Sequence, residues 1–320
     1  LLTSSELNCR KVRALSPILT NEELEKLRNI DLEGFKSITI PSLFNVKQEN
    51  DMETAMDTKQ KIKIMEDLSL NAWPSYQMQI YDGWILRFSY FYTHRTNCIE
   101  QLGHSSIPLQ DKLDYCEDIY EKWGTPAIYK INPLLDSSFD QRLMERGYFM
   151  AHVTEVMTRS LYAYKASGKQ NPNITLHTEI SDQWLKGLFA MKGMTNETHL
   201  KIVPSMYAAI PKDTLAVCAW HSGRIIGTGL GILDRDYVGL YAIHVHQDFR
   251  GKGIGRAICE TLLEASRQRG AAFAYLQVVQ GNRPAKKLYE ALGFEDFYTY
   301  WFRQQYSVAR GENIPCEGQK

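Results

Sequence analysis

A short glycine-rich segment is the strongest chemical signal in this chain of 320 residues. It reads Arg250-Gly251-Lys252-Gly253-Ile254-Gly255. The segment stands between a β-rich run, VGLYAIHV, and an amphipathic helix pattern, RAICETLLEASRQR. Glycines allow several backbone N–H groups to face one point and a ligand to come close, and the helix that follows adds the positive end of its dipole. The segment therefore predicts a phosphate site, here for a pyrophosphate.

The spacing of the glycines separates three kinds of loop. A P-loop requires G-x-x-x-x-G-K-[ST], and this spacing is absent. A Rossmann loop requires G-x-G-x-x-G after a first strand, whereas this segment has G-x-G-x-G and comes late in its half. A glycine-rich turn without a ligand is the structural alternative. The position between a strand run and a helix run favours a ligand-binding loop of another kind.

A second pattern begins at Asn282 and reads N-x-x-A-x-x-L-Y-x-x-x-G-F. The two patterns, in this order, resemble those of the GNAT acetyltransferase superfamily. Its motif A, [RQ]-x-x-G-x-[GA], is matched by Arg250, Gly253 and Gly255, and the resemblance covers about residues 173–305. The first half resembles the degenerate partner domain of tandem GNAT proteins in the phrases AWPS, DGWILRFS and THRTN.

The resemblance implies acetyl-CoA as the donor substrate. Backbone groups of Ile243 and Val245 would hold the pantetheine arm and polarise the thioester carbonyl, an effect typically worth a few kcal/mol. The N–H groups of the glycine loop would hold the pyrophosphate. Asn282 would cap its helix and touch the cofactor, and a cap alone is the other interpretation. The implied cofactor-binding residues are Ile243, Val245, Arg250, Gly251, Lys252, Gly253, Ile254, Gly255, Arg256, Asn282 and Ala285.

Two side chains are candidates for the catalytic proton transfers. Tyr289 is the candidate general acid, because a phenol can protonate the CoA thiolate that leaves; a tyrosine that only packs is the alternative. His244 is the candidate general base, since its side chain points to the opposite face of the strand from its two neighbours. His246, His199 and an ordered water chain are further options. The sequence has no metal-ligand spacing, so no metal is expected.

The pattern of apolar residues predicts an α/β (α+β) chain made of two GNAT-like mixed-sheet units in tandem, behind an N-terminal helical extension. The extension, with a helix from a capping box at residue 20 to about residue 30, covers residues 1–65. A degenerate GNAT-like domain without cofactor is expected over 66–165, the catalytic domain over 166–310 and a tail over 311–320. The linker ASGKQNPN joins the two domains.

The two halves repeat with an offset of 146 residues, which four residue pairs share. The pairs are Gly124 and Gly270, Gly147 and Gly293, Gln101 and Gln247, and Tyr148 and Phe294. Chance alignment of two helix–strand–helix units is the alternative. Duplication of one αβ unit explains the shared offset better.

The same offset indicates that the first half holds no cofactor. It aligns His104 with Arg250, Ile107 with Gly253, Leu109 with Gly255, and Leu143 with Tyr289. Side chains of Ile and Leu would fill the space that a pyrophosphate needs, and a β-branched residue resists the φ values that glycine allows. Pro108, beside them, also removes a backbone donor.

Composition narrows the class of partner. Lys plus Arg and Asp plus Glu both number 37, so the net charge is zero and a basic footprint for nucleic acid is missing. No apolar run approaches the roughly 20 residues that span a bilayer, and the N-terminus LLTSSELNCRK is too polar for a signal peptide. Six scattered cysteines without a C-x-x-C pair predict reduced thiols and a cytoplasmic location. We expect no nucleic-acid or membrane partner; a monomer and a homodimer are both open.

These observations predict a GNAT-type N-acetyltransferase, an acyltransferase enzyme. It would move an acetyl group from acetyl-CoA to a primary amine of a small molecule by direct attack in a ternary complex. Transfer of another acyl group, such as succinyl or propionyl, is the alternative enzyme activity. A non-catalytic acyl-CoA-binding sensor is disfavoured by the intact loop and Tyr289, and a nucleotide-binding oxidoreductase by the glycine spacing.

Titration with acetyl-CoA is expected to give one site per chain, because only the second half keeps the glycine loop. Calorimetry measures this stoichiometry directly. Two equivalent sites per chain, or cofactor bound near residues 104–109, would show that the offset aligns the wrong positions.

Overall fold

The computed structural model describes residues 57–166 and 173–305. The predicted helix near residue 20, most of the linker and the tail lie outside these residues. The described helices are α4 (Thr58–Ala72), α5 (Leu109–Lys122), α6 (Ser137–Glu145), α7 (Asp182–Lys192), α8 (Glu197–Ala208), α9 (Ile254–Gln268) and α10 (Arg283–Ala291), with short 3₁₀ helices η2 (His94–Thr96) and η3 (Gln247–Phe249). The described strands are β1 (Gln77–Tyr81), β2 (Trp84–Phe88), β3 (Ile99–Gln101), β4 (Ile128–Ile131), β5 (Phe149–Ser160), β6 (Ile174–His177), β7 (Asp213–His221), β8 (Arg224–Asp234), β9 (Tyr237–Val245), β10 (Phe273–Val279) and β11 (Glu295–Gln304).

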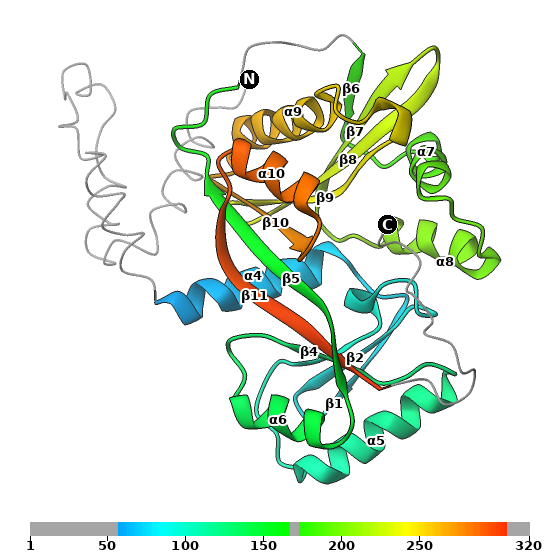
Figure 1. Cartoon of the computed structure of the whole chain (residues 1–320), viewed down its shortest axis with the longest axis vertical. Helices are drawn as coiled ribbons and strands as arrows, with labels where there is room; N and C mark the ends of the chain where they lie inside the picture. The colour runs from blue at the N-terminus through cyan, green and yellow to red at the C-terminus, as the bar shows by residue number, and fades with distance from the viewer. Residues whose placement is uncertain (1–56, 167–172, 306–320) are drawn as a thin grey trace, which may run out of the picture. The chain divides into compact units, whose positions relative to one another are not determined.

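One mixed sheet joins all of these strands, in the order β1-β2-β3-β4-β11-β5-β10-β9-β8-β7-β6 (Figure 1). Neighbouring strands are antiparallel, except that β3 runs parallel to β4 and β9 runs parallel to β10. The predicted α/β class with mixed sheets is therefore confirmed.

The repeat seen in the sequence is also a repeat of structure. The elements α5, β4, α6 and β5 of the first half recur in the same order as α9, β10, α10 and β11. Helix α6 covers Ser137–Glu145 and α10 covers Arg283–Ala291, so both ends differ by 146 residues (283 − 137 and 291 − 145). The two halves therefore share one αβ unit in tandem.

The last strand of each half is built into the other half. β5 pairs with β10 over residues 154–160 and pairs with β11 along its other edge. β11 in turn pairs with β4 over residues 128–131. Each half thus completes its part of the sheet with a strand from the other. The domain boundary at residue 166 stays a prediction, and the sheet is continuous across it.

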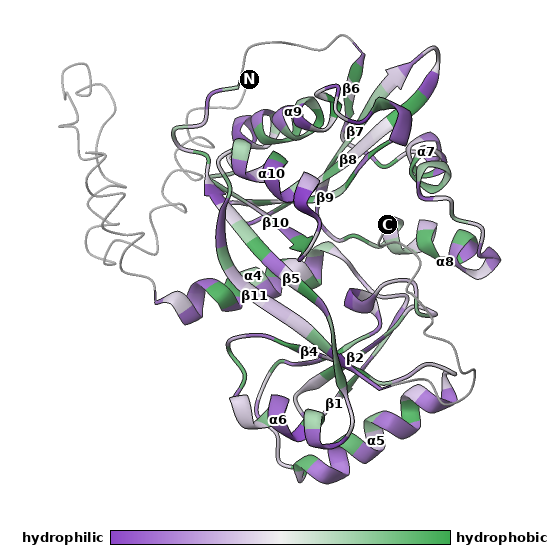
Figure 2. Cartoon of the chain, viewed as in Figure 1, coloured by the Kyte–Doolittle hydropathy of each residue, from purple (hydrophilic) through white to green (hydrophobic). Residues whose placement is uncertain are grey.

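Helices cover both faces of the sheet. The clusters of buried residues place α5, α6, α9 and α10 on one face and α4, α7 and α8 on the other (Figure 1). The register agrees, because Tyr298 and its partner Val156 pack with α4, whereas the adjacent Met157 packs with α9. Figure 2 shows apolar and polar residues together on α5 and α9, as expected for helices that bury one side.

Helix α8 was not predicted from the sequence. It begins after Asn196, whose Oδ1 accepts the His199 N–H at 2.9 Å. Pro204 lies inside the helix, and because proline removes a backbone donor it usually marks a helix end. Burial of Ile202 and Val203 against α7 stabilises the helix despite Pro204.

A buried ionic network crosses the first half beneath α4. Lys130 Nζ lies 2.8 Å from Glu66 Oε2 and 3.3 Å from Glu100 Oε2, and Arg87 Nη1 lies 3.4 Å from Glu100 Oε1. Tyr298 of β11 donates its hydroxyl to Glu66 at 2.5 Å. Burial opposes the charge of Lys130, but Glu100 and Glu66 outweigh it and hold the pKa of Lys130 above its usual range. The network therefore ties α4, three strands of the first half and β11 together.

Lys130→Met is expected to lower the free energy of unfolding by about 3–5 kcal/mol, because it leaves two buried carboxylates short of a cation. Urea unfolding followed by circular dichroism measures this. The matched control is Lys286→Met, whose ion pairs with Glu155 and Asp296 are partly exposed and should contribute at most about 1 kcal/mol. Equal stability of the two variants would contradict a structural role for the network.

Candidate active site

Strands β9 and β10 run side by side only at their starts. Parallel pairing extends from Tyr237 with Phe273 to Leu240 with Leu276 and ends there. Beyond that point β10 stays paired with β5, and β9 stays paired with β8. The two strands therefore diverge, and the backbone groups on their facing edges lack a strand partner. An extended ligand can enter the sheet at this separation as a further strand would.

A β-bulge lies in β9 just after the separation begins. The register with β8 shifts between Thr228 and Leu230, and the opposing Ala242 has a φ of 49°. Thr228 Oγ1 donates to the Ala242 carbonyl oxygen at 3.1 Å. Because a bulge turns the next backbone groups out of the regular ladder, the peptide of Ile243 is re-aimed here. Nothing in the sequence marks Ala242, since an alanine gives no signal for a left-handed backbone.

The glycine loop after β9 is open on its outer side. Gly251 and Gly253 have φ values of 74° and 78°, and a Cβ on either would meet no atom within 4 Å. Gly253 is the N-cap of α9 and gives no side-chain cap, so the N–H groups of residues 254–256 lack a helical acceptor. Arg250 Nε donates to the Val245 carbonyl oxygen at 3.1 Å and ties the loop to the end of β9. The loop thus presents N–H donors and the positive end of α9 to an anion.

The other predicted cofactor residues surround this loop. Lys252 Nζ and Arg256 Nη2 each donate to a backbone oxygen, at 3.0 Å and 3.1 Å. The predicted cap of α10 is confirmed, because Asn282 Oδ1 accepts the Ala285 N–H at 3.3 Å. Contact of these residues with a cofactor stays a prediction. Four predicted residues pack partly buried against the core beneath α9: Ile243, Val245, Ile254 and Ala285.

Tyr289 of α10 lies in the same core cluster and is 9% exposed. Its ring meets Phe294 edge-on at 6.2 Å, and its hydroxyl has no hydrogen-bond partner among the described residues. Burial, followed by the nearby Cys259, raises the pKa of Tyr289 above its usual range. The phenol is therefore protonated at neutral pH, as a general acid requires.

The three candidate histidines stand in different surroundings. His244 is half-buried on β9, where burial, then Lys192, then Arg250 lower its pKa to about 4. His246 caps η3, since its Nδ1 accepts the Asp248 N–H at 3.3 Å. His199 is buried and bonds through Nε2 to a backbone oxygen in the first half at 2.9 Å. Of the three, His244 lies on the diverging segment of β9 and is neutral at physiological pH.

The equivalent loop of the first half is occupied by the protein itself. Asp82 accepts the backbone N–H groups of Ser106 and Ile107, at 2.9 Å each, and lies 3.3 Å from Lys112 Nζ. The N–H groups of Ile107 and Ser106 hold the pKa of Asp82 well below its usual range. An internal carboxylate thus takes the N–H donors that an offset of 146 aligns with residues 252–253 of the open loop.

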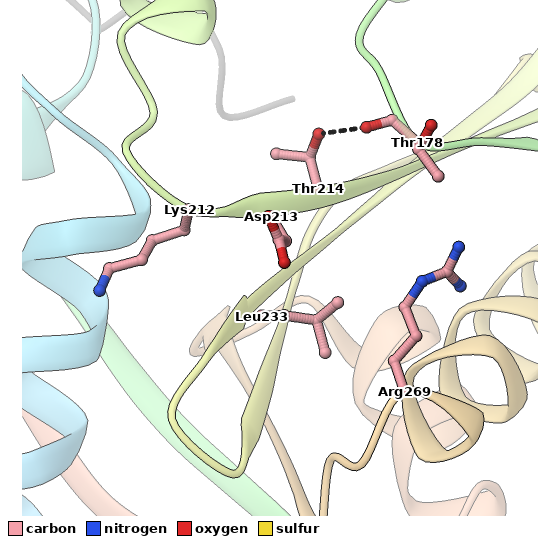
Figure 3. A pocket seen from close by; sticks show the side chains of 6 residues that line it. All are labelled: Thr178, Lys212, Asp213, Thr214, Leu233 and Arg269. Carbon is pink, nitrogen blue, oxygen red and sulfur yellow. Dashed lines mark hydrogen bonds between the residues drawn. The ribbon is translucent and has the colours of Figure 1, made fainter. Parts of the chain in front are cut away.

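Figure 3 shows a surface hollow away from this site. It is lined by Thr178, Lys212, Asp213, Thr214, Leu233 and Arg269. Thr214 Oγ1 donates to the Thr178 carbonyl oxygen at 3.1 Å (Figure 3). Leu233 pairs with Val238 near the start of β9, whereas the glycine loop follows the end of β9. None of the predicted site residues lines the hollow.

The described residues provide neither a cluster of metal ligands nor a helix that could span a membrane. No group of three or more His, Cys, Asp or Glu side chains within 57–166 and 173–305 is arranged to hold a metal ion. No described helix has the length and apolar character that crossing a membrane requires.

Solved structures that share this fold include GNAT N-acetyltransferases. A GCN5-related N-acetyltransferase from Kribbella flavida superposes with a TM-score of 0.57 at 14% identity, over 78% of this chain and 96% of that one. A tandem GNAT protein from the clavulanic acid biosynthesis pathway superposes with a TM-score of 0.51 at 13% identity, over 65% and 75%. The fold is therefore that of a tandem GNAT protein.

Sequence comparison assigns the family within that class. The family model described as "probable histone acetyltransferase Rv0428c C-terminal" matches residues 59–302, and the chain belongs to this family. The chain is also similar to the uncharacterized N-acetyltransferase YobR of Bacillus subtilis, with 26% identity over 246 residues, which cover 76% of this chain and 98% of that protein. The resemblance to GNAT proteins noted in the sequence is therefore confirmed.

Gly253→Val is expected to abolish acetyl-CoA binding, because a β-branched residue resists a φ of 78° and puts atoms into the open space above the loop. Calorimetry measures the affinity. The matched control is Gly270→Val, since Gly270 also has a left-handed φ, 94°, with open space, but stands beyond the far end of α9. Unchanged affinity in a folded Gly253→Val variant would remove the loop from the binding site.

Proposed function

We propose that this chain transfers an acetyl group from acetyl-CoA to a primary amine of a small molecule, by direct attack in a ternary complex. The observation that carries the proposal is the separation of β9 from β10, followed directly by a loop in which Gly251 and Gly253 border open space and the first N–H groups of α9 have no acceptor within the helix. In the first half, Asp82 fills the equivalent loop. The second half therefore offers the one described loop of this repeat that is free to hold a pyrophosphate.

The proposed catalytic roles in the second half are divided between the two faces of the sheet. Gly251 to Arg256 would hold the pyrophosphate on the α9 side, and the backbone after the bulge at Ala242 would polarise the thioester carbonyl. Tyr289, protonated on the same side, would give its proton to the leaving CoA thiolate. His244, neutral on the α7 side, would accept the proton of the attacking amine. Because its pKa is about 4, His244 is unprotonated through the whole neutral range, although a base with so low a pKa is weak.

Other substrates and partners would require different chemical groups at the site. Another acyl group, such as succinyl or propionyl, is the alternative donor. The description of the family names histones, but a chain with zero net charge gives no electrostatic support for a basic protein tail. Neither nucleic acid nor a membrane is proposed as a partner, and a monomer and a homodimer both stay open. The cytoplasmic location stays a prediction; the cysteines at 98, 116, 218 and 259 are free and buried.

Release of free thiol from acetyl-CoA tests the proposed activity. The purified chain is assayed against a panel of small primary amines and a basic lysine-rich peptide, with Gly253→Val as the control that lacks donor binding. Turnover with small amines supports the proposal. Turnover with the peptide alone would contradict the small-molecule acceptor, and binding of acetyl-CoA without turnover on any amine would favour a sensor.

Tyr289→Phe is expected to lower kcat by about 10²–10⁴-fold, because the ring keeps its packing while the acidic hydroxyl is lost. The affinity for acetyl-CoA should change little. Tyr164→Phe is the matched control, since Tyr164 lies in the same core cluster with the same 9% exposure. Equal rates for the two variants would reduce Tyr289 to a packing residue.

A further inference from the structure

Two basic side chains from different halves approach the separation of β9 and β10. Arg95, in η2, donates from Nη1 to Gln277 Oε1 at 2.9 Å. Lys192, the last residue of α7, donates from Nζ to the Tyr92 hydroxyl at 3.1 Å. Both side chains are half-buried. Neither forms an ion pair with a carboxylate within the described part of the chain.

The hydrogen-bond partners of Arg95 and Lys192 show where these two side chains lie. Gln277 is the first residue of β10 after Leu276, where pairing with β9 ends. It pairs with Val156, which packs with α4, so Gln277 faces the side of the sheet that α4 and α7 cover. Lys192 ends α7, which covers this same side, and His244 also faces it, because its neighbours Ile243 and Val245 pack on the α9 side. Arg95 and Lys192 therefore border the separation opposite to Tyr289 and the glycine loop.

The local field on this side is positive. Burial, then Arg95, lowers the pKa of Lys192 to about 8. Burial and Arg95 also lower the pKa of His152, as burial, Lys192 and Arg250 do for His244. The charged side chains that shift the pKa values of Lys192, His152 and His244 are all cations. Two half-buried cations without an anion are unfavourable, so an anion from outside the chain would stabilise them.

The phosphates of CoA are poorly placed to be that anion. The proposed pyrophosphate loop follows Val245, whereas Gln277 and Arg95 stand where pairing ends at Leu240. Five residues of strand separate these points, which is about 16 Å at roughly 3.3 Å per residue. The reacting thioester end of acetyl-CoA carries no charge. A negative group beside Arg95 must therefore belong to the acceptor or to a longer acyl chain.

We propose that Arg95 and Lys192 together bind a carboxylate of the substrate, so that the acceptor is an amino acid or a similar amine that bears a carboxylate. This inference rests on the acetyl transfer proposed above. A guanidinium and an ammonium on two elements would grip the carboxylate while His244 faces the amine. The same cations would repel a lysine-rich tail. A carboxylate on the acyl chain, as in succinyl-CoA, is the second source of the same chemistry.

The test compares each free amino acid with its own amide as acceptor. Glycine, leucine, phenylalanine and glutamate serve as the panel, with acetyl-CoA at saturation. The kcat/KM for the acid should exceed that for the amide by about 10-fold or more, as expected for a charge-assisted contact. Arg95→Met and Lys192→Met should each reduce this acid-to-amide ratio by about 10-fold. Lys212→Met, which removes a cation paired with Asp234 at the hollow of Figure 3, is the control that should keep the ratio.

The second arm identifies which substrate carries the carboxylate. Succinyl-CoA and acetyl-CoA are compared as donors with an amide acceptor. If Lys192→Met lowers kcat/KM for succinyl-CoA about 10-fold more than for acetyl-CoA, the carboxylate lies on the acyl chain. Equal use of acids and amides with both donors, or variants that keep both ratios, would overturn the proposal.

A binding experiment tests this inference independently of the proposed activity. If no amine releases thiol, acetyl transfer fails on its own, and calorimetry with N-acetylglycine and N-acetylglycinamide then tests the carboxylate site. The wild-type chain should bind the acid about 10-fold more tightly than the amide, and Lys192→Met should lose that preference. Equal affinity for the two probes would overturn the carboxylate site whatever the outcome of the thiol assay.

Discussion

The end of parallel pairing between β9 and β10 is the constraint on which the rest of the structure depends. Beyond Leu240 and Leu276, β9 stays paired with β8 and β10 stays paired with β5, but β9 and β10 no longer pair with each other. The backbone groups on their facing edges therefore lack a strand partner and are available to a ligand. The divergence is held open by β5, a strand of the first half that pairs with β10 to its last residue, Val279. The half without an open loop is thus part of the frame of the proposed active site, because its strand β5 fixes one wall of the separation.

The two faces of the sheet differ in the charged and polar groups that they carry near the proposed site. On the α9 face, the core reaches Tyr289, and the polar groups proposed to hold the donor are backbone N–H groups at the start of a helix. On the α7 face, burial and then the cations Lys192 and Arg250 keep His244 neutral. In the first half an acidic residue, Asp82, satisfies the equivalent N–H groups. One repeated unit therefore carries the proposed ligand site in one copy and a closed internal contact in the other.

Local signals in the sequence predicted the features that depend on local backbone. Spacing and residue type act over a few positions, so the sequence alone predicted three kinds of feature. These are the glycines at 251 and 253, the cap at Asn282 and the helix patterns of α5 and α9. The bulge at Ala242 was not predicted, since alanine has no preference for a left-handed φ. Arg95 and Lys192 stand 97 positions apart, and only the folded chain brings both to β9 and β10. Helix α8 was hidden by Pro204, whose cost is offset by burial that no local pattern reports.

The exchange of β5 and β11 has a consequence for the order in which the protein can be made. Both strand partners of β5 come later in the chain, because β10 begins at Phe273 and β11 ends at Gln304. While the ribosome has delivered only the first half, β5 has no neighbour and one edge of β4 is bare. Domains usually fold one after another as they emerge, but here the first half must wait for the last strand of the second. Closure of the sheet is therefore a late, long-range event, and a ribosome that stops before Gln304 releases two unfinished halves rather than one finished domain.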